Sequence, residues 1–144
     1  MLDLARRRVL RACPESFSRV HFIHKDVRSW FPQNSYDLFV THFFFDCFPR
    51  AEVQSIAAKI AHAAGLNAVW LISDFTVPLR GTIAQLHACA WLRIMYFFFR
   101  STAGIAANEL VDAAPSLEAN GFSCAAQKLS RGGMLKADLF RAVR

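Results

Sequence analysis

The sequence has no arrangement of cysteine and histidine that would hold a metal ion, and none that is typical of a disulfide framework. Cys13, Cys47, Cys89 and Cys124 are widely spaced, form no CxxC pair and have no histidine at ligand distance. This pattern predicts reduced, buried thiols. Because the N-terminus also shows no secretory signal, we expect a cytoplasmic protein.

Long apolar runs and clustered positive charge are also absent. The longest apolar stretch, Ile83 to Phe99, contains His87 and Arg93 and is shorter than the ~20 residues that span a bilayer. The net charge is +6, but the only basic run is Arg6 to Arg8, and nucleic-acid binding usually needs a basic stripe with interleaved aromatics. We therefore expect neither a transmembrane segment nor a nucleic-acid partner.

Apolar residues are abundant instead. The chain is 54% hydrophobic and 19% charged, with 14 phenylalanines among 144 residues, so it is more apolar and less charged than an average soluble domain. This length is the size of one domain. The high content of apolar residues predicts either a core that is large for this length or apolar surface that is left for a partner.

Apolar spacings of three and four residues predict helices, and the regions concerned are 2–12, 49–64, 82–100 and 113–121. Pro14 should stop the first helix, and Pro49 should start the second. Gly65 is placed to cap the C-terminus of the second helix. Asp112 is placed to cap the N-terminus of the last one.

Apolar runs predict the strands, which we place at 19–26, 36–42, 68–74, 122–130 and 134–142. The nearly continuous run in 36–42 predicts burial on both faces. The Gly132-Gly133 pair predicts a hairpin between the last two strands. Strands that alternate with helices predict an α/β fold, in which a parallel sheet is closed by an antiparallel hairpin. We expect a single domain over 1–144.

Polar residues follow the predicted strands. Asp26, the Thr41-His42 pair and Asp74 stand at their carboxyl ends, where ligands bind in open α/β sheets. Asp26 has a second interpretation, as a helix or turn cap, and Asp74 has one as a cap of the turn that follows it. His42 has one too, as a hydrogen-bonded wall residue.

The stretches "KDVRSWFPQNSYDLFVTHFFFDCF" (25–48) and "GLNAVWLISDF" (65–75), followed by "GF" and the hairpin, resemble the class I S-adenosylmethionine-dependent methyltransferases that act on small molecules. The resemblance covers essentially the whole chain. It implies a Rossmann-like sheet, S-adenosylmethionine as cofactor and methyl transfer to a small-molecule acceptor.

The resemblance also implies roles for particular residues on the cofactor. Met1 would pack on the adenine, Asp26 would accept a hydrogen bond from its amino group, and the backbone N–H of Val27 would meet its ring. Thr41 and His42, with Phe43 beside them, would line the methionine and sulfonium end.

Other residues would face the acceptor. The segment Phe43–Phe48 would begin a helix that walls the transfer site, with Phe45 against the acceptor and Asp46 facing acceptor or solvent. Trp91 and Tyr96 could reach the acceptor from the 82–100 helix. We name His42 and Asp46 as candidate catalytic residues, because His42 could take a proton from a hydroxyl or amine. Aromatic walls would attract the sulfonium cation.

The sequence departs from this family's pattern in its glycines. They stand at positions 65, 81, 104, 121, 132 and 133, and no GxGxG loop is among them. The resemblance places that loop, and the first two strands, ahead of residue 1. The sheet would then lack its centre, between 19–26 and 36–42. Residues 27–35 reach only ~30 Å, too short a link to let these two strands pair without strain.

We therefore expect that this chain does not bind the cofactor tightly. Two alternatives to a methyltransferase stay open. One is a non-catalytic, truncated homologue that acts through protein contacts, including self-association through exposed strand edges. The other is a module that binds a hydrophobic ligand or a membrane surface through its phenylalanine-rich faces.

Overall fold

The structure is a computed structural model, and it describes residues 2–76, 90, 111–130 and 133–143. The chain divides into two compact units, Met1–Trp30 and Phe31–Arg144. Each unit is described by itself. The expectation of one domain over the whole chain stays a prediction.

The first unit contains helix α1 (Leu2–Ala12) and the 3-10 helix η1 (Pro14–Arg19). The predicted opening helix and its end before Pro14 are confirmed. No residue of either helix is buried. Arg6 lies over the ring of Phe22, 5.4 Å from its centroid, and the rings of Phe22 and Phe17 are 6.3 Å apart. This unit is a small cluster around two aromatic rings.

The predicted strand over 19–26 is wrong. Residues 20–24 carry no strand pairing, and Val20 and Ile23 are 38% and 53% exposed. A strand needs a neighbour to take its backbone hydrogen bonds, and no strand is described within this unit. Phe22 packs against Phe17 instead.

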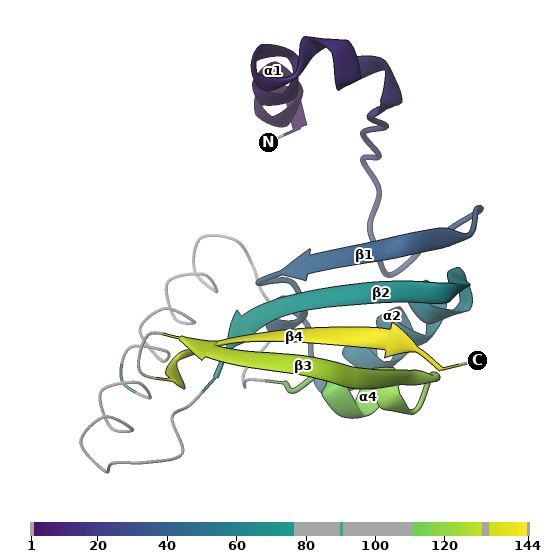
Figure 1. Ribbon diagram of the computed structural model, residues 1–144, viewed down its shortest axis with the longest axis vertical. Helices are drawn as coiled ribbons and strands as arrows, with labels where there is room; N and C mark the ends of the chain where they lie inside the picture. Colours follow the sequence, from purple (N-terminus) through teal and green to yellow (C-terminus); the bar gives the residue numbers. More distant parts are fainter. Residues whose placement is uncertain (1, 77–89, 91–110, 131–132, 144) are drawn as a thin grey trace. The chain divides into compact units, whose positions relative to one another are not determined.

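The second unit is built on a mixed sheet (Figure 1). Its described strands are β1 (Tyr36–His42), β2 (Ala64–Phe75), β3 (Phe122–Ser130) and β4 (Leu135–Ala142). Their order is β1-β2-β4-β3, in which β1 runs parallel to β2, and β4 is antiparallel to both β2 and β3. The predicted parallel pair, closed by an antiparallel hairpin, is confirmed.

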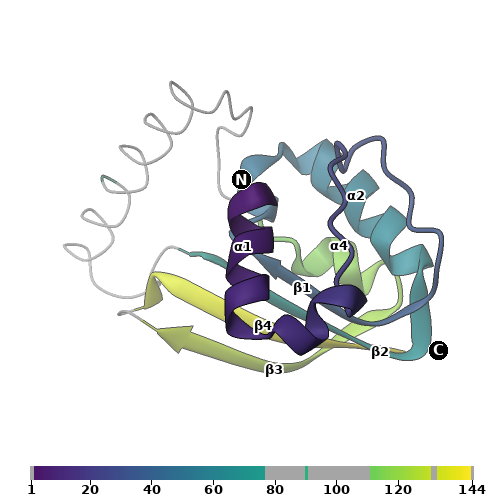
Figure 2. The same cartoon turned by 90° about the horizontal axis from the view of Figure 1, so that it is seen from above.

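Helices cover one face of this sheet. Helix α2 (Arg50–His62) and the short α4 (Ala114–Glu118) lie on the same side of it (Figures 1 and 2). The apolar stripe predicted for the second helix is confirmed, because these residues are buried: Val53, Ile56, Ala57, Ile60 and Ala61. The N-cap of α4 is Ala113 and not the predicted Asp112, and no side chain caps the helix. Asp112 lies one residue earlier, where its Oδ1 accepts the backbone N–H of Ala114 at 3.1 Å.

Gly65 does not cap helix α2. The helix ends at His62, Ala63 is its C-cap, and Gly65 belongs to β2. A Cβ atom at Gly65 would stand 2.9 Å from the carboxylate Oδ1 of Asp37. The glycine therefore allows β2 to begin immediately after the helix, close to the start of β1.

Trp70 lies at the centre of the core with no exposed surface. Its ring centroid is 5.2 Å from that of Phe39 on β1, 6.0 Å from Phe45 and 5.6 Å from Phe122 on β3. Phe45 is also fully buried. One side chain of β2 thus ties together an edge strand, the segment after it and the hairpin.

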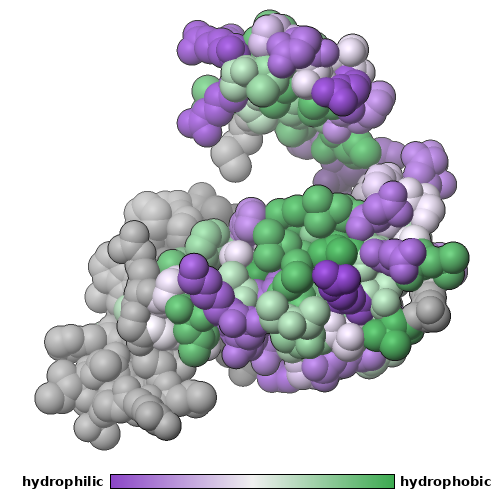
Figure 3. Space-filling model, in the orientation of Figure 1, coloured by the Kyte–Doolittle hydropathy of each residue, from purple (hydrophilic) through white to green (hydrophobic). Residues whose placement is uncertain are grey.

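The opposite face of the sheet is open, so the predicted burial of 36–42 on both faces is wrong. Leu38 and Val40 are 60% and 49% exposed. They point away from α2 and α4, because Phe39 and Thr41 alternate with them and pair with Trp70 and Ile72 on the covered face. Figure 3 shows apolar side chains gathered on this open face.

The described cysteines are free thiols, as predicted, but the prediction that they are buried is wrong, because none of the three is buried. Cys13 and Cys124 are exposed, and Cys47 is half-buried. The helix predicted for 82–100, and Cys89 within it, lie outside the described residues.

Trp70→Ala should lower the free energy of unfolding by about 3–5 kcal/mol, because it leaves a cavity where three rings meet. Leu66→Ala is the matched control on the same strand: Leu66 is 74% exposed, and its loss should cost about 0.5 kcal/mol or less. Urea unfolding followed by circular dichroism measures both. Equal effects of the two substitutions would contradict the central place of Trp70.

Candidate functional site

The carboxyl end of β1 presents two polar side chains in opposite directions. Thr41 is half-buried on the helix-covered face, where its Oγ1 accepts a hydrogen bond from Trp70 Nε1 at 3.1 Å. His42 is exposed and lies in register with Ser73 of β2. The Trp70 indole therefore anchors Thr41, while the imidazole of His42 is accessible.

The chain turns sharply after His42. Phe43 has φ 49°, a left-handed conformation that costs a residue with a Cβ roughly 1–2 kcal/mol. Its N–H donates to the carbonyl of Ser73 at 2.8 Å, and its ring lies 4.7 Å from that of Phe75. Phe43 is 46% exposed. An aromatic pair thus stands at the carboxyl ends of β1 and β2.

The next two candidate residues are buried. Phe45 begins the 3-10 helix η2 (Phe45–Cys47), where a longer helix was predicted, and its ring packs against Phe44 at 5.2 Å and Trp70 at 6.0 Å. Asp46 is 6% exposed, so it does not face solvent as one expectation had it. In the described structure Phe45 is a core residue.

Asp46 and Asp74 form a buried acid pair. The N–H of Phe75 donates to Asp46 Oδ2 at 3.5 Å. Burial, and then the neighbouring Asp74, raise the pKa of Asp46 to about 7. Burial also raises the pKa of Asp74 to about 6, although the backbone N–H of Phe44 and the charge of Lys136 act in the opposite direction. These two carboxyls therefore take up protons near neutral pH.

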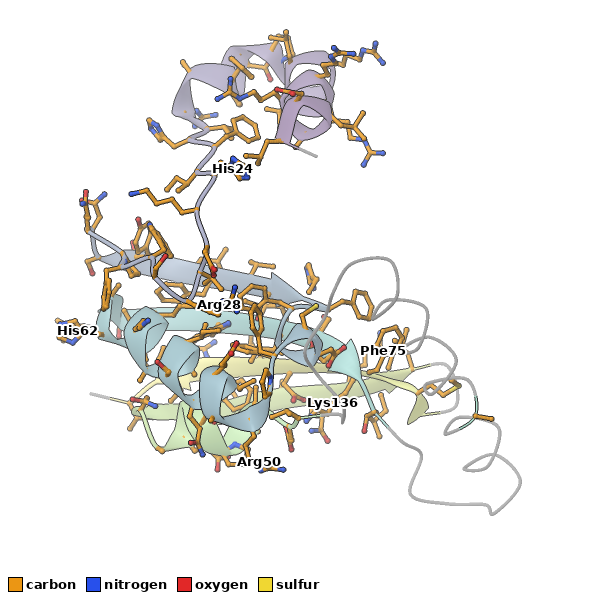
Figure 4. The ribbon with its side chains drawn as sticks, turned by 180° about the vertical axis from the view of Figure 1, so that it is seen from behind. His24, Arg28, Arg50, His62, Phe75 and Lys136 are labelled. Carbon is orange, nitrogen blue, oxygen red and sulfur yellow. The ribbon has the colours of Figure 1, made fainter. Side chains whose placement is uncertain are left out.

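Lys136 lies on β4 at the same end of the sheet as Phe75 (Figure 4) and connects this strand to the segment that leads into α4. Its Nζ lies 3.0 Å from Asp112 Oδ1 and 3.0 Å from Asp138 Oδ2. Burial acts to lower the pKa of Lys136, but the two carboxylates outweigh it and raise that pKa. Our sequence reasoning missed this group. The signal was present, since Lys136, Asp138 and Phe140 alternate on one face of a predicted strand.

Asp26 and Val27 belong to the first unit. Asp26 pairs with Arg28: the N–H of Arg28 donates to its Oδ1 at 2.9 Å, and the guanidinium Nη2 lies 2.7 Å from its Oδ2. The carbonyl of Asp26 accepts the N–H groups of Ser29 and Trp30. Asp26 therefore organises a turn, and its convergence with Thr41 on one ligand stays a prediction.

Three candidate residues, Met1, Trp91 and Tyr96, lie outside the described residues. Within residues 2–76, 90, 111–130 and 133–143, no three histidine, cysteine, aspartate or glutamate side chains are grouped so as to hold a metal ion. No helix in this part of the chain is long and apolar enough to cross a bilayer.

No known family profile and no curated protein sequence matches the chain. Solved structures do match it in fold. They include a "possible exported protein" of Bordetella parapertussis (TM-score 0.70, 14% identity, 99% of this chain, 50% of that one). They also include the mitomycin 7-O-methyltransferase MmcR (TM-score 0.66, 17% identity, 95% of this chain, 38% of that one). The pyocyanin biosynthetic protein PhzM matches as well (TM-score 0.66, 11% identity, 95% and 39%).

The mixed α/β sheet therefore has a fold similar to that of these methyltransferase structures. The chain spans half or less of the length of these three proteins.

Stability should fall as the pH rises from about 4 to about 7. In this window the folded state holds protons on Asp46 and Asp74 that the unfolded chain, at the ordinary pKa of 3.8, has lost. Asp46→Asn removes the buried charge, so it should raise the melting temperature relative to the parent chain at pH 8 and raise it less at pH 5.

Asp37→Asn is the control, since Asp37 is exposed at the start of β1. Thermal unfolding at both pH values measures the difference. A stabilisation by Asp46→Asn that is equal at pH 5 and pH 8 would show that Asp46 does not titrate as described.

Proposed function

We propose that this chain is the acceptor-side part of an S-adenosylmethionine-dependent methyltransferase that acts on a small molecule. The likeness in fold to O-methyltransferase structures supports this proposal, since it extends over 95% of the chain for MmcR. The observation that carries it is the Thr41-His42 pair at the carboxyl end of β1, in the place where such sheets bind ligands.

The described residues offer part of what the cofactor needs. The ring pair of Phe43 and Phe75 suits a sulfonium cation, and Thr41 and His42 flank the same strand end. Bound S-adenosylmethionine would supply an already activated methyl group, so the protein has mainly to position the acceptor and exclude water. His42 is exposed and would accept the proton of a hydroxyl or amine acceptor.

The rest of the cofactor site is missing from this sequence. It contains no GxGxG loop, and β1 is the end strand of the described sheet. In this proposal the GxGxG loop and the ribose-binding acid belong to two further strands, which would pair with the outer edge of β1. Asp26 and Val27 would then complete the adenine site. Methyl transfer by this chain alone is therefore impaired.

The free thiols of the described cysteines support a cytoplasmic location, which we also propose.

The chain alone should bind S-adenosylmethionine with a Kd of about 100 µM or weaker by calorimetric titration. A fusion that places the glycine-loop strands of MmcR ahead of residue 1 should bind at least about tenfold more tightly. Within that fusion, Asp26→Ala should weaken binding, whereas Asp37→Ala should not. Micromolar binding by the chain alone, or a folded fusion that binds no better than the chain, would refute the proposal.

A second function is favoured by the open sheet face. Leu38 and Val40 are exposed on it, and the outer edge of β1 has no neighbouring strand among the described residues. Exposed apolar edge strands pair readily with another chain. In this alternative the protein is a non-catalytic homologue that acts through protein contacts, self-association included.

Sedimentation velocity tests this alternative. If β1 mediates self-association, the parent chain should sediment as a concentration-dependent dimer or larger species, and the double substitution Leu38→Lys and Val40→Lys should make it monomeric. Leu66→Lys, at an exposed position near the start of β2, is the control and should leave the assembly unchanged. A parent chain that is monomeric at all concentrations would exclude self-association.

A further inference from the structure

A cavity of about 220 Å³ opens on the helix-covered side of the sheet, between the end of β2, the start of β4 and the segment that leads into α4. Polar and apolar walls meet in it. The charged lining consists of Asp74, Asp112, Lys136 and Asp138, with the neutral Thr76 beside them, and Ile72 and Phe75 are among the apolar walls. The cavity shares Phe75 with the aromatic pair at the strand ends, but Thr41 and His42 do not line it.

Negative charge dominates this lining. The carboxyls of three aspartates and the ammonium of Lys136 line the cavity, so the net charge of the lining is −2 when all four groups are ionised. Lys136 satisfies one oxygen of Asp112 and one of Asp138 at 3.0 Å each. Asp74 has no ion pair of this length within the described part of the chain, and the nearby Asp46 adds to the same negative potential.

Two of the carboxyls are buried and incompletely bonded. Asp74 and Asp138 are 7% and 3% exposed. The Oδ1 atom of each is buried and has no hydrogen-bond partner among the described residues. A buried acceptor that is left without a donor costs about 1–3 kcal/mol, and more when it is charged. Both residues line the cavity, so a donor that enters it comes close to two carboxyls that the protein leaves incompletely bonded.

Charge decides which kind of donor fits. An anion would add repulsion, and a neutral hydroxyl would satisfy an oxygen but leave the charge in place. A protonated amine supplies several N–H donors and also neutralises the buried charge. We propose that this cavity binds a small organic ammonium ion, whose charged nitrogen lies at Asp74 and Asp138 and whose apolar part packs on Ile72 and Phe75. This proposal does not depend on methyl transfer.

Three probes of similar size and different charge test it: benzylamine, benzyl alcohol and benzoate. Each is titrated into the isotope-labelled chain while amide chemical shifts are followed by NMR. Benzylamine should bind and shift the amides that line the cavity, benzyl alcohol should bind at least about tenfold more weakly, and benzoate should not bind. Benzyl alcohol or benzoate binding as tightly as benzylamine would overturn the proposal.

Matched variants locate the site. Asp74→Asn removes the carboxylate and should weaken the binding of benzylamine at least about tenfold. Asp37→Asn makes the same change at the opposite end of the sheet and should leave the affinity for benzylamine unchanged. Ala114→Leu leaves every carboxyl in place but narrows the cavity, because Ala114 lines it, and should also weaken binding. No benzylamine binding up to about 10 mM, or equal losses in the Asp74 and Asp37 variants, would overturn the proposal.

Discussion

The parallel pairing of β1 with β2 is the interaction on which the rest of the structure depends. Trp70 on β2 donates its Nε1–H to the hydroxyl oxygen of Thr41 on β1 at 3.1 Å. The ring of Trp70 also packs against that of Phe39, which is on β1 as well. A buried indole must find an acceptor for its N–H, so this bond sets the position of Thr41 at the end of β1. The turn at Phe43, the aromatic pair and the buried acids all follow from where that strand ends.

This arrangement has a consequence for each side of the sheet. On the covered side, the strand ends direct carboxyls inward, and Asp46, Asp74 and Asp138 are at least nine-tenths buried. Burial raises the pKa of Asp46 and of Asp74, which lowers stability at neutral pH, and shifts of this kind cluster at functional sites. On the open side, Leu38 and Val40 lack a cover within the described residues. The unit thus carries polar groups that need a ligand, together with apolar surface that suits a further layer.

Helices and strands that depend on residues close together in the sequence could be predicted from the sequence alone. Pro49 and an apolar stripe predicted α2, and the run 36–42 predicted β1. The strand predicted for 19–26 failed because its pattern of apolar residues does not reveal whether a neighbouring strand exists. Burial of 36–42 on both faces failed for a related reason, since the cover of each face depends on where the helices pack. The group around Lys136 was missed because its partner Asp112 is 24 residues away in the sequence, and only the packing of the segment before α4 brings the two side chains together.

Amide hydrogen exchange along β1, at concentrations where the chain is monomeric, tests the central claim most directly. The N–H of Phe43 donates to the carbonyl of Ser73 on β2. Thr41 and Phe39 lie in register with β2, so their N–H groups should also point toward β2 and be protected from exchange. The amides of Val40 and His42 should point to the free outer edge and exchange rapidly. Alternating protection is the predicted result, and strong protection at all four positions from Phe39 to His42 would contradict a sheet that ends at β1.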